Sequence, residues 1–235
     1  MKRLVQPELL DTLPPDDPCA IRSRRDLRRI NWWMNNPAIM ARALQDHWPK
    51  PSSQITELGA GDGNFLLRVA QKIQVGQAPS LSSSAPQLAT LLDLQKNVSP
   101  ETLAAFTRFG WHAEAVIADV FDWPFAAGAD EVVIANLFLH HFEDGRLAEL
   151  LRKIAQNAKL FIAIEPQRSA LPSVAGKLLR LIGCNDVTRH DAVISIRAGF
   201  AGQEISALWP DSQNWRLTEH RAGLFSHLFI ARRRE

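Results

Sequence analysis

Three glycines at alternate positions, Gly59, Gly61 and Gly63, stand between a strand-like segment and a helical one. Residues 54–58 before them have the apolar pattern of a buried strand, and residues 64–73 after them have the spacing of an amphipathic helix. Glycines in such a turn let the backbone bend sharply and approach a ligand without intervening side chains. This order of strand, glycine turn and helix constrains the chain to an α/β fold with a ligand-binding edge.

The same alternation of strands and helices continues along the chain. Further strands are predicted at residues 88–92, 114–118, 131–135, 159–164, 215–220 and 225–231. Further helices are predicted from residue 99 and at residues 147–154, 174–182 and 191–198. The pattern therefore predicts a Rossmann-like, doubly wound α/β fold whose mainly parallel sheet ends in an antiparallel hairpin.

The first 50 residues differ in pattern from the rest. Prolines and aspartates at residues 13–18 indicate an irregular entry, and a helix is predicted from about Ser23. The side chains expected on its core face are Leu27, Ile30, Trp32, Trp33 and Met34. We therefore predict an N-terminal helical cap over residues 1–50 and a ligand-binding domain over residues 51–235. A stretch rich in Ser, Pro and Gly at residues 74–87 is predicted to be a surface insertion.

Composition and charge argue against several classes of protein. The formal charge of +2 gives no broad positive field, so nucleic acid is not an expected partner. Cys19 and Cys184 are too few and too far apart for a disulfide framework or a zinc site, so we expect a cytoplasmic protein and no metal. No apolar run approaches the roughly 20 residues of a membrane span, so no integral membrane association is expected. The oligomeric state stays open.

Acidic residues follow two of the predicted strands. Asp93 ends the second strand and Asp119 follows the third, at the sheet edge where open α/β folds bind ligands. The alternative is that both acids only cap local turns. A dinucleotide fingerprint needs its third glycine one position later, where this chain has Asn64, so the spacing disfavours a pyrophosphate ligand.

Four groups of residues, in order, resemble the class I S-adenosylmethionine-dependent methyltransferases over about residues 50 to 165. The first is the acidic and glycine pattern from Glu57 to Gly63, and the second is Asp93. Asp119 with Val120 is the third, and the run from Asn136 to Phe142 is the fourth. The resemblance implies S-adenosylmethionine as the cofactor and methyl transfer as the reaction.

The resemblance also implies a role for each matched residue. Glu57 and the glycine backbone would hold the methionine portion, and Asp93 would accept hydrogen bonds from the ribose hydroxyls. Asp119 and the Val120 amide would bind adenine, and Asn136 would border the reactive end. The full set of expected cofactor-binding residues is Glu57, Gly59, Ala60, Gly61, Gly63, Asp93, Leu94, Asp119, Val120 and Asn136. Arginines of the cap that could bind the carboxylate of the cofactor are Arg24, Arg25 and Arg28.

Segments that flank this core are similar to those of a bacterial methyltransferase subgroup of secondary-metabolite type. They are residues 26–31, 189–192 and 195–200. This similarity implies a small hydrophobic or phenolic acceptor. The atom that receives the methyl group, whether oxygen, nitrogen or carbon, stays open.

Histidines are the candidates for a general base at the acceptor, because imidazole accepts protons near neutral pH. His140 and His141 directly follow the fourth strand, and His190 lies in a region expected to cover the acceptor. The alternatives are that the pair packs or caps the next helix and that His190 is an ordinary surface residue.

Three rival functions fit parts of the pattern. A nicotinamide-dependent oxidoreductase shares the strand, glycine turn and helix, but not the glycine spacing or the acid after the third strand. A non-catalytic binding module is expected to have lost some of the acids and glycines, and all are present. A nucleic-acid methyltransferase commonly carries an Asn-Pro-Pro-aromatic motif where this chain reads Asn136-Leu137-Phe138-Leu139. A small-molecule methyltransferase is therefore favoured, and protein methylation stays open.

Overall fold

The computed structural model describes residues 2–14, 16–48, 54–76, 87–125, 131–168 and 179–234. Residues 77–86 of the predicted insertion and residues 174–178 of a predicted helix lie outside the described residues. The described helices are α1 (Leu9–Thr12), α2 (Pro18–Trp33), α3 (Asn36–His47), α4 (Asn64–Gly76), α5 (Pro100–Thr107), α6 (Asp144–Asn157), α8 (Asp186–Ala198) and α9 (Glu204–Leu208), with 3-10 turns η2 (Leu139–His141) and η3 (Ser212–Asn214). None of these helices combines the length and apolar composition needed to cross a membrane.

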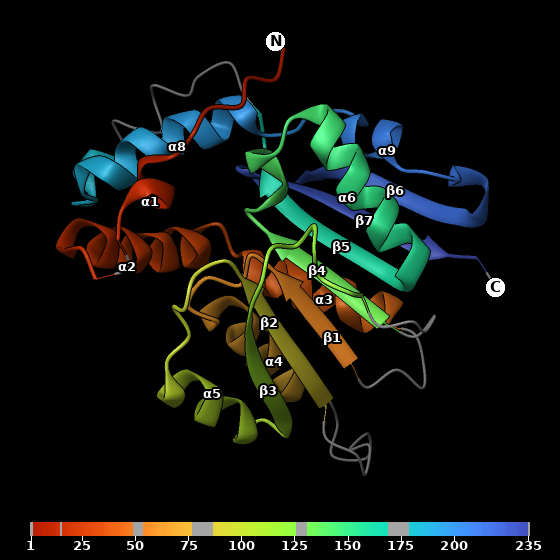
Figure 1. Cartoon of the computed structure of the whole chain (residues 1–235), viewed down its shortest axis with the longest axis horizontal. Helices are drawn as coiled ribbons and strands as arrows, with labels where there is room; N and C mark the ends of the chain where they lie inside the picture. Colours follow the sequence, from red (N-terminus) through yellow and green to blue (C-terminus); the bar gives the residue numbers. More distant parts are fainter. Residues whose placement is uncertain are drawn as a thin grey trace.

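A seven-stranded sheet forms the centre of the molecule (Figure 1). Its strands are β1 (Gln54–Leu58), β2 (Gln87–Asp93), β3 (Trp111–Ile117), β4 (Glu131–Asn136), β5 (Ala158–Pro166), β6 (Trp215–Ala222) and β7 (Ser226–Arg233). They lie in the order β3-β2-β1-β4-β5-β7-β6, with β1 to β5 parallel and β7 antiparallel to both of its neighbours. The predicted fold class and terminal hairpin are confirmed. β3 begins at Trp111 rather than at Glu114, because residues 111–113 pair with the start of β2.

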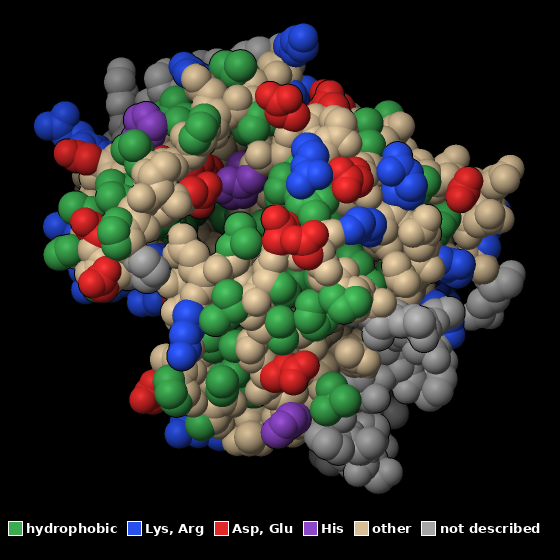
Figure 2. Space-filling view, in the orientation of Figure 1, with side chains coloured by type: hydrophobic (Ala, Val, Ile, Leu, Met, Phe, Trp, Pro, Cys, Tyr) green, Lys and Arg blue, Asp and Glu red, His purple; other side chains and the backbone are tan. Residues whose placement is uncertain are grey.

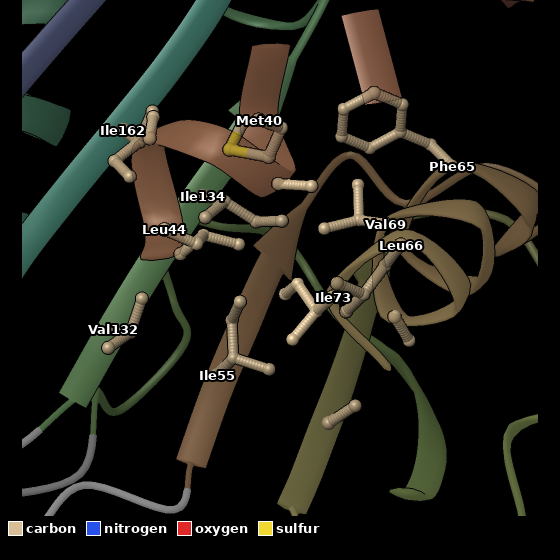
Figure 3. Packing of buried hydrophobic residues seen from close by; sticks show 14 of the residues in the cluster. Met40, Leu44, Ile55, Phe65, Leu66, Val69, Ile73, Val132, Ile134 and Ile162 are labelled. Atoms are coloured by element: carbon tan, nitrogen blue, oxygen red, sulfur yellow. The ribbon is translucent and has the colours of Figure 1, made fainter. Parts of the chain in front are cut away.

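Helices cover both faces of the sheet, because successive strand residues point to opposite sides. On one face, Met40 and Leu44 of α3 pack against the strands beside α4 (Figure 3). The apolar face predicted for the helix after the glycine turn is confirmed, since its buried residues are Phe65, Leu66, Val69 and Ile73. On the opposite face, Leu150 and Ile154 of α6 belong to a second core cluster with Phe161 of β5.

The segment predicted as a cap divides between two places in the fold. α3 is part of the core layer on the sheet, as the burial of Met40 and Leu44 demonstrates. α1 and α2 instead lie with α8 beyond the edge at which the parallel strands end (Figure 1). The domain boundary at residue 50 stays a prediction.

The structure corrects the buried face predicted for α2. Trp32 and Trp33 are each 65% exposed, so neither belongs to the core. The predicted residues that are only partly buried are Leu27, Ile30 and Met34. The buried residues of the helix are Ala20, Ser23 and Asp26. The helix also begins at Pro18 rather than near Ser23, because the Asp17 carboxylate caps it.

Polar contacts with α8 explain this orientation of α2. Ser23 Oγ lies 2.8 Å from Thr188 Oγ1, and the backbone amide of Asn185 donates to Asp26 at 2.9 Å. Buried polar groups require such partners, so α2 turns these side chains rather than its tryptophans toward α8. Asn185 also caps α8, which therefore begins at Asp186 and not at residue 191.

Candidate functional site

A cavity of about 610 Å³ opens where the parallel strands end, between the cap helices and the sheet. Figure 2 shows this face hollowed, with acidic and histidine side chains around the hollow. The predicted residues in its lining are Glu57, Gly59, Ala60, Gly61, Asp93, Leu94, Asp119, Val120, Asn136, His140 and His141. Gly63 and His190, which were also predicted, lie outside the lining. The fold therefore brings most of the predicted set to one place.

The glycine turn after β1 borders this cavity. Gly59, Gly61 and Gly63 have φ angles of +66°, +56° and +72°, which L side chains rarely adopt. A Cβ on Gly59 would lie 2.2 Å from the Phe138 ring, so a side chain there would force the ring away. A Cβ on Gly61 would meet nothing within 4 Å, so open space lies beside this backbone. Gly63 packs instead near Leu91, where a Cβ would approach the leucine Cδ1 to 2.9 Å.

Asp93, at the end of β2, is joined to the glycine turn. Its Oδ2 accepts from the Gly61 amide at 2.8 Å, and its Oδ1 accepts from the Gln95 amide at 2.8 Å. Each carboxylate oxygen has a further lone pair, so Asp93 can still accept hydrogen bonds from a ligand. Asp119 likewise accepts from the Phe121 amide at 2.8 Å. The capping contacts that the sequence left open are present for both acids, and both acids also line the cavity.

Glu57 is a buried carboxylate with one unsatisfied oxygen. Its side chain belongs to the buried wall of the cavity, and its Oε2 has no hydrogen-bond partner among the described residues. Burial raises the pKa of Glu57 well above its ordinary value, and the nearby carboxylates of Asp62 and Asp93 raise it further. An unsatisfied buried acceptor is costly, so a cation or a hydrogen-bond donor bound beside it would be stabilising.

Asn136, at the end of β4, belongs to a cluster of asparagines that ties the cap to the sheet. Asn36 Nδ2 donates to Asn136 at 3.0 Å, and Asn136 Nδ2 donates to Asn31 of α2 at 3.2 Å. Ser226 donates to Asn36 at 2.6 Å. The next residue, Leu137, has a φ of +52°, an uncommon conformation for a residue with a side chain. The end of β4 is thus held in one particular geometry beside the cavity.

His140 is held between two carboxylates. Its Nδ1 lies 2.7 Å from Glu165 Oε2, and its Nε2 lies 3.3 Å from Glu8 Oε1. Burial alone lowers the pKa of His140, but the hydrogen bonds to Glu165 and Glu8 outweigh burial and raise the pKa to about 9. Burial by itself raises the pKa of Glu8, but the hydrogen bond to His140 contributes to lowering it to about 2.

Glu165 also fixes the backbone of η2. This carboxylate is fully buried and accepts from the amides of Phe138 at 3.0 Å, Leu139 at 2.8 Å and His140 at 3.3 Å. Glu165 lies near the end of β5 and orients the loop that carries both histidines.

His141 and His190 lie in different surroundings. The His141 side chain is 25% exposed and its Nδ1 lies 3.3 Å from Asp11 Oδ2, while its ring centroid is 4.3 Å from that of His140. His190 is half-exposed and its Nδ1 lies 3.0 Å from Asp191 Oδ1. His140 and His141 are therefore together at the cavity, and a role for His190 at the acceptor stays a prediction.

The N-terminal segment adds residues that the sequence analysis missed. Glu8 and Asp11 line the cavity although they come from the first dozen residues of the chain. Asp191 fixes this segment, because its carboxylate accepts from the amides of Leu9 at 2.9 Å and Leu10 at 3.0 Å. No local pattern singles out Glu8 or Asp11, since their positions depend on contacts with α8 and η2.

The rest of the lining combines charge from α2 with aromatic rings. Arg24 and Arg28 line the cavity, and Arg28 forms an ion pair with Asp62 of the glycine turn. Three phenylalanines in edge-to-face contact supply an apolar, aromatic surface. Their ring centroids are 5.4 Å apart for Phe121 and Phe142 and 5.1 Å apart for Phe138 and Phe142. The cavity therefore offers both charged and aromatic surfaces.

No protein-family model matches the chain, and no curated protein matches it in sequence. Solved structures do match. The plantazolicin methyltransferase BpumL, in complex with SAH, aligns with a TM-score of 0.63 at 12% identity, over 93% of this chain and 92% of that one. A putative O-methyltransferase from Nostoc punctiforme aligns with a TM-score of 0.59 at 14% identity, over 91% of this chain and 60% of that one.

The mitomycin 7-O-methyltransferase aligns with a TM-score of 0.55 at 18% identity, over 95% of this chain and 60% of that one. At these identities the likeness concerns the fold. The strand order and the antiparallel last strand agree with it. The chain has the fold of the class I S-adenosylmethionine-dependent methyltransferases.

Proposed function

We propose that the protein is an S-adenosylmethionine-dependent methyltransferase that acts on a small hydrophobic or phenolic molecule. One observation carries this proposal. The carboxylates of Glu57, Asp93 and Asp119, in or just after three neighbouring strands, line a single cavity together with the glycine turn. A methyl donor with an ammonium, a ribose and an adenine offers one hydrogen-bond donor group for each of these acids.

The residues present fit this cofactor. Glu57 Oε2 is a buried acceptor that has no partner within the described part of the chain, which suits a ligand ammonium. Asp93 keeps free lone pairs on both oxygens for two hydroxyls, and the open space beside Gly61 leaves room for a ligand against the backbone. S-adenosylmethionine supplies an activated methyl group on a sulfonium. The roles of these side chains are to bind and orient it.

The acceptor is proposed to lie near η2. Here Phe138 and Phe142 supply aromatic surface, and His140 and His141 supply polar groups. In the transfer the acceptor atom forms a bond to the methyl carbon, the carbon–sulfur bond breaks, and its electron pair returns to sulfur. The proton of the acceptor leaves, so alignment, exclusion of water and removal of that proton are the tasks left to the protein.

Other functions receive less support. A nicotinamide cofactor would place a pyrophosphate at the glycine turn, where the spacing to Asn64 does not suit it. The aromatic lining of the cavity suits a small acceptor. A nucleic-acid acceptor is less supported, because the formal charge is only +2. A cytoplasmic location is proposed because both cysteines, Cys19 and Cys184, are free thiols.

Titration calorimetry tests the cofactor directly. The protein is expected to bind S-adenosylmethionine and its demethylated product with dissociation constants in the micromolar range, which corresponds to a binding free energy of about −8 kcal/mol. It is expected to show no binding of NAD. Heat released by NAD but not by the methyl donor would overturn the proposed function.

Asp93→Asn tests the ribose contact. We expect donor binding to weaken by about 1.5–3 kcal/mol for each charge-assisted hydrogen bond that is lost. Some stability should also be lost, because both Asp93 oxygens hold backbone amides. Asp122→Asn is the matched control, because Asp122 is an exposed aspartate that does not line the cavity. A folded Asp93→Asn protein that binds the donor as tightly as the parent would place the ribose elsewhere.

A further inference from the structure

Glu8, His140 and His141 place three potential metal ligands together at the cavity wall. One ligand atom of each residue lies within 4.8 Å of those of the other two. Among the described residues, no other group of three potential ligands lies this close together. Glu8 and His140 are buried, and His141 is partly exposed toward the cavity that all three line. The sequence predicted no metal because it considered cysteine spacing, whereas this group joins the adjacent His140 and His141 to Glu8, which is 132 residues from His140 along the chain.

We propose that Glu8, His140 and His141 bind one divalent transition-metal ion of the zinc type. Two imidazoles and a carboxylate form a donor set that such ions accept. With three protein ligands, at least one position of the ion is left for a ligand from the cavity. The sulfonium and sugar portions of the methyl donor are proposed to lie at the glycine turn and Asp93, which share no residue with this site.

The separation of the ligand atoms suits a metal. His140 Nε2 and Glu8 Oε1 are 3.3 Å apart, which is long for a charge-assisted hydrogen bond, usually about 2.7–2.9 Å. Two ligands about 2.1 Å from one ion, at a tetrahedral angle, lie roughly 3.4 Å apart. The separation of these two atoms is therefore close to that of two ligands of one ion.

Outer carboxylates orient both imidazoles. His140 Nδ1 lies 2.7 Å from Glu165 Oε2, and His141 Nδ1 lies 3.3 Å from Asp11 Oδ2. Metal-binding histidines almost always donate their second ring N–H to a carboxylate, carbonyl or water in this way. The remaining nitrogen, Nε2, is then the ligand atom of each ring.

The charge of the site also favours a cation. Glu8, Asp11 and Glu165 surround the two imidazoles, and the Ser195 hydroxyl donates to Glu8 without adding charge. Asp191 holds the backbone at Leu9 and Leu10, next to Glu8, so this ligand is positioned by the fold and not by the ion alone.

The role of the ion rests on the proposed function. It would coordinate the hydroxyl oxygen of the acceptor and lower the pKa of that hydroxyl. The proton passes to bulk water, and the oxygen attacks the methyl carbon while the carbon–sulfur electron pair returns to the donor sulfur. A metal at this wall would therefore activate the acceptor.

The experiment uses the full chain after treatment with a chelator. Zinc chloride is titrated by calorimetry, and cobalt chloride is followed by its visible absorption, which reports the coordination geometry of the bound ion. We expect one ion per chain for each metal. Glu8→Gln and His141→Gln should each weaken binding by more than the roughly 10–100-fold that loss of an outer-shell partner costs. His112→Gln is the matched control, because His112 is an exposed histidine on β3 that does not line the cavity.

Two outcomes would overturn the metal site. One is the absence of stoichiometric binding of either ion to the folded parent protein. The other is binding that neither Glu8→Gln nor His141→Gln weakens while circular dichroism indicates that both variants are folded. Calorimetry with S-adenosylmethionine on the same samples separates the two proposals, because donor binding without metal binding rejects only the metal. Metal binding without donor binding rejects the proposed function and leaves the ion site intact.

Discussion

Replacing His141 with glutamine is expected to slow methyl transfer by about a hundredfold to ten-thousandfold and to leave donor affinity unchanged. His141 lies at the cavity wall, where the acceptor is proposed to bind, and not at the glycine turn or Asp93. In the proposed function His141 acts on the acceptor, either as a proton acceptor or through the proposed metal. Glutamine retains a similar size and polarity but does neither as well as imidazole.

Single-turnover methyl transfer, measured by mass spectrometry of a candidate phenolic acceptor with labelled donor, checks this expectation. Calorimetry on the same variant checks that the donor still binds. His112→Gln is the control, since His112 is exposed on β3 and is not part of the cavity lining. A His141→Gln protein with a rate near that of the parent would remove His141 from the reaction and leave alignment, or a base at His140 or His190, as the catalytic effect.

Glu165→Ala is expected to lower the free energy of unfolding by about 3–5 kcal/mol, the range for removal of one partner from a buried ion pair. The carboxylate is fully buried and accepts from three backbone amides as well as from His140 Nδ1. Its removal leaves those donors unsatisfied in a place that water does not reach easily. The effect is large because one side chain satisfies four donors.

Urea denaturation of parent and variant measures this difference. Glu149→Ala is the control, because the partly exposed Glu149 pairs with Arg146 on α6 and such surface pairs contribute about 0–1 kcal/mol. A Glu165→Ala protein that loses no more stability than Glu149→Ala would indicate that η2 is held by other contacts.

The proposed donor side of the site follows closely from local sequence patterns. The strand before Gly59, the helix after Gly63 and the acid at the end of β2 are each encoded within about ten residues, by apolar spacing and by turn chemistry. Parallel strands end at one edge of the sheet, so the positions of Asp93 and Asp119 near each other follow from the alternation alone. The terminal hairpin also follows from a local pattern, because two strand-like segments flank a turn at Gly223.

Other features follow only from packing. Trp33 has the helical position of a core residue, but it is exposed because α2 satisfies its buried polar groups on α8. Spacing along one helix indicates which residues share a face, but not which face meets a partner. That choice depends on the hydrogen bonds available on the partner, and these become known only when both helices are placed.

The proposed acceptor side was decided by the tertiary structure. His140 was a candidate from its position after β4, but Glu8 is 132 residues away along the chain and had no local signal. Their contact requires the N-terminal segment to be held by Asp191 and η2 to be held by Glu165. Local patterns determine secondary structure because they act over a few residues. A cluster assembled from distant segments is determined by burial and by the need to satisfy each buried polar group, which only the folded chain can meet.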